Sequence, residues 1–143
     1  MAHARQSIRE AVATAVTGLA STGSRVFQSR MRPQETLPCL LVTAGDEDVQ
    51  TDVGSIQTRV LEISIVGVAK AAANVDDALD TIAAEVEVAV QAAGTLGGLV
   101  SVPPVLVRIR TDFDDSLEQP VGEISLTFGC TYFTNAGVPG TTV

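Results

Sequence analysis

The stretch Leu61-Glu62-Ile63-Ser64-Ile65 lies inside a longer segment, residues 56–69, that reads as one extended strand. A repeat of two places its three aliphatic residues on one side of the strand, and Glu62 and Ser64 on the other. This alternation predicts a half-buried β-strand. Such a strand needs other strands beside it and an apolar layer over one face.

Other segments supply both. Short apolar or alternating runs predict four further strands, at residues 25–28, 39–44, 105–110 and 124–132. Apolar residues spaced three and four apart predict two helices. The first covers residues 4–19, with Ile8, Val12, Ala15, Val16 and Leu19 on one side. The second begins after Asn74, a candidate N-cap, and carries the stripe Val75, Leu79, Ile82, Val86 and Val90.

The element order is therefore α-β-β-β-α-β-β. Short connections favour antiparallel neighbours, so we expect a single α+β domain over residues 1–143, with a mainly antiparallel sheet of about five strands packed against two helices. Residues 135–143 are rich in Gly and Thr and are predicted to form a flexible tail.

Composition narrows the functional classes. The chain is 45% hydrophobic, which is enough for a packed core, and its net charge of −8 repels nucleic acid phosphates. We therefore expect no sequence-specific nucleic acid binding. No run of about 18 apolar residues occurs, so no membrane contact is expected. The N-terminus shows no signal peptide.

Catalytic groups are scarce. His3 is the only histidine, and Cys39 and Cys130 both fall in apolar strands, so we expect two buried thiols, although a disulfide stays open. Paired acids such as Asp76 and Asp77 are better explained by a solvated helix start than by a metal site. The sequence thus predicts no catalytic residues, no metal site and no cofactor.

Two polar regions are candidates for protein interfaces. Residues 45–55 are acidic, lack periodicity and are predicted to form a mobile loop that orders on a partner, with Asp46, Glu47, Asp48 and Asp52 as contact residues. We expect its deletion to leave the fold intact. In the other region, Arg108 and Arg110 share one face of a strand, where Glu123 and Ser125 of the next strand are expected to face them. The result is either a solvated polar surface or a subunit interface.

The ordered segments resemble the tail terminator family of long-tailed bacteriophages, the minor tail protein U type. The resemblance covers nearly the whole chain and rests on the order of individually unspecific pieces: Ser7-Ile8-Arg9-Glu10-Ala11-Val12, Arg25-Val26-Phe27-Gln28-Ser29-Arg30, Leu37-Pro38-Cys39-Leu40-Leu41-Val42, the acidic segment, residues 61–68, the helix from Asp76 to Glu87, and the closing segments Pro120-Val121-Gly122-Glu123 and Phe128-Gly129-Cys130-Thr131-Tyr132.

The resemblance implies a non-enzymatic virion protein. Such a subunit forms a hexameric ring on the tail tube, stops tube polymerisation and presents the surface that joins the head. The implied partners are copies of the chain itself, the major tail tube protein and head-tail connector proteins, with DNA passing through the ring. The implied location is the virion tail, assembled in the bacterial cytoplasm.

Within this hypothesis Arg30 and Arg32, in the connector before residue 37, are candidates for pairing with acids of a neighbouring subunit. Two alternatives remain. One is a head-completion or neck protein, and the other is a small metal-dependent enzyme.

Overall fold

A computed structural model describes residues 2–28, 37–52, 54–70, 73–114 and 120–143. Arg30 and Arg32 lie outside these ranges. The elements are α1 (Ala4–Ala15), β1 (Val26–Phe27), β2 (Cys39–Thr51), β3 (Ile56–Lys70), α2 (Val75–Ala92), β4 (Val105–Asp114) and β5 (Val121–Asn135). The predicted order is confirmed.

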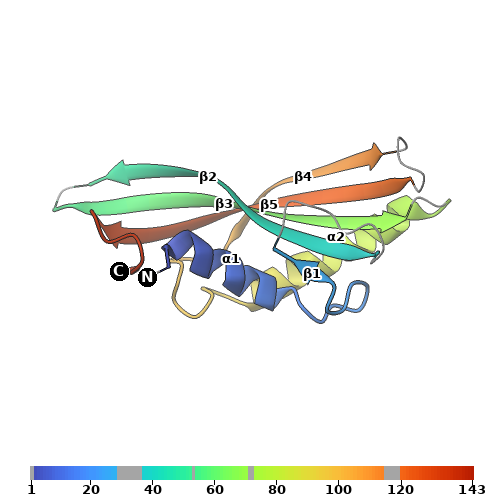
Figure 1. Ribbon diagram of the computed structural model, residues 1–143, viewed down its shortest axis with the longest axis horizontal. Helices are drawn as coiled ribbons and strands as arrows, with labels where there is room; N and C mark the ends of the chain where they lie inside the picture. Colours follow the sequence, from blue (N-terminus) through green and yellow to red (C-terminus); the bar gives the residue numbers. More distant parts are fainter. Residues whose placement is uncertain (1, 29–36, 53, 71–72, 115–119) are drawn as a thin grey trace.

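The strands form one five-stranded sheet in the order β1-β2-β3-β5-β4 (Figure 1). Among the described strands, only β1 runs parallel to its neighbour, β2, and the other neighbouring pairs are antiparallel. The predicted fold class, α+β with a mainly antiparallel sheet, is confirmed. The alternating segment around Ile63 becomes β3, at the centre of the sheet.

Packing explains why β3 takes the central place. Its inward residues Leu61, Ile63 and Ile65 are paired in register with Cys130, Phe128 and Leu126 of β5, and all six side chains are at most 4% exposed. A strand with an apolar row this long gains most when both neighbours contribute apolar residues to the same face.

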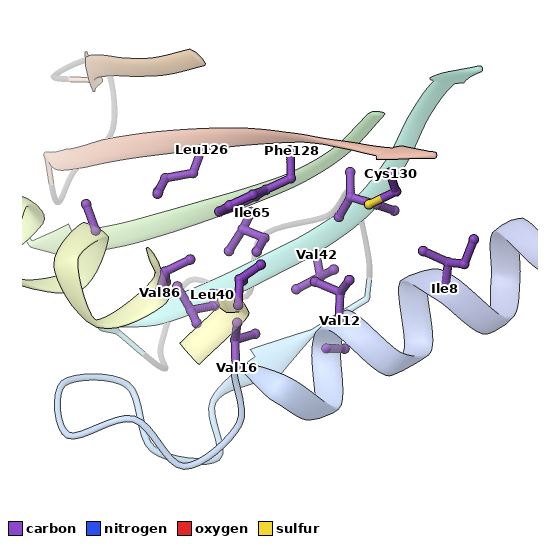
Figure 2. Packing of buried hydrophobic residues seen from close by; sticks show 14 of the residues in the cluster. Ile8, Val12, Val16, Leu40, Val42, Ile65, Val86, Leu126, Phe128 and Cys130 are labelled. Carbon is purple, nitrogen blue, oxygen red and sulfur yellow. The ribbon is translucent and has the colours of Figure 1, made fainter. Parts of the chain in front are cut away.

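Both helices cover that face. Figure 1 shows α1 and α2 on the same side of the sheet, under different parts of it. Figure 2 shows Ile8, Val12 and Val16 of the α1 region turned toward sheet residues such as Val42. All five apolar residues of the predicted α2 stripe are buried, as the spacing required. Asn74 is the N-cap residue, but its side chain makes no capping hydrogen bond, so that part of the prediction is wrong.

Two glycines let α2 approach the sheet closely. A Cβ atom at Gly67 of β3 would lie 2.8 Å from Ile82 Cγ2, and one at Gly122 of β5 would lie 2.9 Å from Val75 Cγ2. Any larger residue at either position would push the helix outward. These glycines therefore set the distance between the helix and sheet layers.

The opposite face of the sheet carries a smaller apolar cluster. It is formed by Cys39, Leu41, Val68 and Val121, all buried, and Phe27, Leu37 and Val66 pack against it. Cys130 belongs to the main core on the helix side. Both cysteines are free and buried, as predicted, and the sheet separates them.

The last residues return to the beginning of α1, and Figure 1 shows the two termini close together. The Ala4 amide donates to the Pro139 carbonyl at 2.8 Å, and the Val143 amide donates to the Phe133 carbonyl at 2.9 Å. The flexible tail expected from the sequence stays a prediction.

Candidate assembly interface

The strand β4 forms one edge of the sheet and is exposed along nearly its whole length. Arg108 and Arg110 are both exposed, and neither makes an ion pair with a described residue. Their cross-strand neighbours are Thr127 and Ser125, whereas Glu123 lies opposite Asp112. The two arginines therefore share one face of β4, as predicted. Glu123, however, lies opposite Asp112, so it is diagonal to Arg110 and farther from Arg108.

Apolar side chains accompany these arginines. Val105, Val107, Ile109 and Phe113 are 58%, 57%, 44% and 51% exposed. A bulge between Leu106 and Arg108 shifts the register. After the bulge, Ile109 is aligned with the buried Leu126 and therefore projects to the helix side of the sheet, while the arginines project to the other side. The sequence predicts either a solvated polar surface or a subunit interface here, but not the exposed apolar residues beside the arginines, because alternation alone does not tell which face of an edge strand is covered.

The predicted mobile acidic loop is wrong. Residues 47–51 continue β2 and pair with β3 in an unbroken register from Glu47 opposite Leu61 to Thr51 opposite Gln57. The irregularity in this pairing is a bulge between Ala44 and Glu47. β2 and β3 form a long hairpin that extends beyond α1 (Figure 1). Deleting this segment would remove half of a strand, so the structure favours a disturbed sheet over an intact fold in such a variant.

Strand geometry separates the acidic residues. Asp46 and Asp48 are exposed, and Val49 between Asp48 and Gln50 is 47% exposed. Asp52, which follows the strand, accepts a hydrogen bond from Thr58 Oγ1 at 2.7 Å. Asp46 and Asp48 make no hydrogen bond or ion pair within the described part of the chain, so both carboxylates are available to a partner.

Glu47 points the other way, into the helix side of the sheet. Its side chain is 5% exposed and pairs with Arg59, with 3.0 Å between Oε2 and Nη1. Its other oxygen accepts a hydrogen bond from the Tyr132 hydroxyl, and Arg59 Nε donates to Thr134 Oγ1 at 2.9 Å. Burial, reinforced by Glu47, raises the pKa of Tyr132 above its ordinary value. This cluster joins β2, β3 and β5, so Glu47 stabilises the hairpin instead of facing a partner.

The described residues offer little for catalysis. No group of three or more His, Cys, Asp or Glu side chains among them is placed to hold a metal ion. A shallow hollow of about 360 Å³ between α2 and the sheet is lined by Ser21, Pro38, Ala69, Ala78, Thr81 and Ile82, none of which is charged. No described helix is long and apolar enough to cross a bilayer.

Comparison with known proteins shows a similarity of fold. No protein family model matches the chain, and no curated protein sequence matches it. Among solved structures, the chain is similar to a component of a structure described as the virion of a native gene transfer agent particle. The TM-score is 0.52 at 18% sequence identity, and the similarity covers 90% of each chain. At this identity the comparison establishes a shared fold over nearly the full length of both chains.

Proposed function

We propose that this chain is a structural subunit of a phage-like virion and that it acts as the tail terminator. The observation that carries the proposal is the common fold, over 90% of both chains, with a component of a gene transfer agent virion. The ordered sequence segments that resemble the terminator family support the more specific role at the end of the tail tube.

A terminator works by shape. It binds the last ring of tube subunits with one surface and presents a different surface to the next component, so that no further tube subunit can add. This fold has two chemically distinct sides. The helix side carries exposed acids of α2 such as Asp80 and Glu87. The sheet face opposite the helices, called here the open side, carries small hydroxyl residues beside its apolar cluster, including Ser64 and Ser125 with their Oγ atoms 3.3 Å apart.

The charge of the chain suits the passage of DNA. A net charge of −8 per subunit is multiplied by the number of subunits in a ring, and negative surfaces repel phosphates. A ring of this composition would let DNA move through without adhering to it.

Removal of the gene from the phage or prophage that encodes it tests the proposal. Negative-stain images of the resulting particles should show tail tubes longer than normal and not joined to heads, and the wild-type gene supplied in trans should restore normal tails. Tails of normal length beside unjoined heads would instead indicate a head-completion or neck protein. A melting temperature raised by one divalent ion would favour the metal-dependent enzyme.

A further inference from the structure

Two stretches of sheet edge have no partner strand within the described residues. One is β4, which pairs only with β5. The other is the outer half of β2 from Asp46 to Thr51, because β1 covers β2 only at Leu40 and Leu41. Free edges expose backbone N–H and C=O groups and pair readily with another strand. An exposed edge as apolar as β4 is therefore a site for association.

The two edges are complementary in charge. On the open side of the sheet, the β4 edge presents Arg108 and Arg110, and the β2 edge presents Asp48, which is aligned with Val60 and Thr131 on that side. Asp46 lies in the adjoining bulge and is also exposed. Opposite charges on neighbouring strands stabilise a sheet, whereas like charges destabilise it.

The apolar residues match as well. On the helix side, β4 presents Ile109, 44% exposed, and β2 presents Val49, 47% exposed. Val49 is aligned with Arg59 and Tyr132, which places it on the same side of the sheet as Leu126 and Ile109. If the β4 edge of one copy pairs with the β2 edge of another and the sheet faces are aligned, the arginines of β4 lie near Asp48 on the open side. On the helix side, Ile109 then lies near Val49.

Strand direction permits this arrangement. Three antiparallel steps separate β2 from β4, from β2 to β3, from β3 to β5 and from β5 to β4, so the two edge strands run in opposite directions. Copies placed side by side in the same orientation therefore bring β4 and β2 together as an antiparallel pair. The two edges lie toward opposite ends of the molecule (Figure 1), so neighbouring copies must be staggered along the strands, as strands are in a closed barrel.

We infer that copies of this chain associate through sheet edges, with β4 of one copy paired to residues 46–51 of the next. The contact uses two different surfaces, so it repeats head to tail and closes into a ring when the rotation between copies allows. The inference rests on the proposed function only for the number of copies in the ring.

Charge exchange between the two edges tests the inference. The variant R108E/R110E has two acidic edges, and the variant D46R/D48R has two basic edges. Each variant alone should sediment as a monomer under conditions in which the wild type sediments as a ring. An equimolar mixture should restore a particle of wild-type size that contains both chains in equal amounts by native mass spectrometry, because every contact again joins an acid to a base.

The variant D80R/E87R is the matched control. It changes the net charge by the same amount as D46R/D48R, but both substitutions lie on the exposed surface of α2, which packs against the inner strands β3 and β5. It should form rings as the wild type does. Circular dichroism of each variant reports whether it is folded. Recovery of rings in the mixture is independent evidence that both edge variants are folded.

Several results would overturn the inference: rings formed by either edge variant alone, a mixture that stays monomeric, loss of rings in D80R/E87R, or a wild type that is monomeric at its highest soluble concentration. Binding of a tube subunit to β4 by an otherwise monomeric chain would assign the edge to that partner instead. Tail length in the gene-deletion experiment is independent of these results. A failure of edge pairing therefore leaves the terminator role intact, and normal tails in the deletion mutant would refute that role without affecting edge pairing.

Discussion

The substitution Glu47→Ala tests whether the acidic segment is a structural strand. In the structure, the Glu47 carboxylate lies between the Arg59 guanidinium and the Tyr132 hydroxyl, and the Glu47 and Arg59 side chains are 5% and 11% exposed. Removing the carboxylate leaves a buried arginine without its counterion and a buried hydroxyl without its acceptor.

The size of the effect follows from burial. Breaking a buried ion pair by removing one partner costs about 3–5 kcal/mol, and a buried donor left without an acceptor costs about 1–3 kcal/mol. The two losses overlap, because water that reaches Arg59 also reaches Tyr132, and Arg59 keeps its bonds to Thr134 and Gln57. We therefore expect the free energy of unfolding to fall by about 3 kcal/mol, which lowers Tm by roughly 6–12 °C for a chain of this size.

Urea denaturation followed by circular dichroism measures this loss. Glu87→Ala is the matched control, since Glu87 is exposed on α2, and its effect should stay within about 0.5 kcal/mol. Both variants should be measured at two or more protein concentrations, because ring formation would add to the apparent stability. If Glu47→Ala and Glu87→Ala have equal midpoints, Glu47 is not part of a buried cluster, and its place on the helix side of the sheet is contradicted.

Two further predictions concern the core. Gly67→Ala should lower the free energy of unfolding by about 1–3 kcal/mol, because the new methyl group would lie 2.8 Å from Ile82 Cγ2 and 3.3 Å from Ile124 Cγ2. In the double variant with Ile82→Ala, the loss of stability should be smaller than the sum of the two single losses. Strict additivity would contradict the close approach of Gly67 to Ile82. Burial raises the pKa of the Cys130 thiol from 9.0 to about 12, so the folded chain retains a proton that the unfolded chain releases. The contribution of the protonated Cys130 thiol to the free energy of unfolding is fully present below pH 9. It is lost as pH rises toward 12, at about 1.4 kcal/mol per pH unit. Alkaline unfolding of Cys130→Val should show a shallower pH dependence than the wild type, and equal slopes would contradict the buried thiol.

The acidic segment shows where sequence reasoning failed. Four acids from Asp46 to Asp52 outweigh the strand signal of Val49 and Thr51, so the sequence predicts a loop there. In the structure the acids alternate in direction. Glu47 is neutralised by Arg59, which lies 12 positions later on the paired strand, and Asp48 faces solvent. A prediction from neighbouring residues does not include a counterion on another strand. It therefore counts the free-energy cost of burying the Glu47 charge but not the ion pair with Arg59 that offsets this cost.

Local patterns were sufficient for the element order, the fold class and the buried stripe of α2, because periodicity of apolar residues is a property of each segment alone. They also placed Arg108 and Arg110 together on one strand. The position of that strand at an edge, the exposure of Ile109 and Val49, and the antiparallel relation of β4 to β2 depend on the order of strands in the sheet. The strand order depends on which rows of apolar side chains pack together in the core, and these rows come from segments far apart in the sequence. Only tertiary packing therefore determines the strand order.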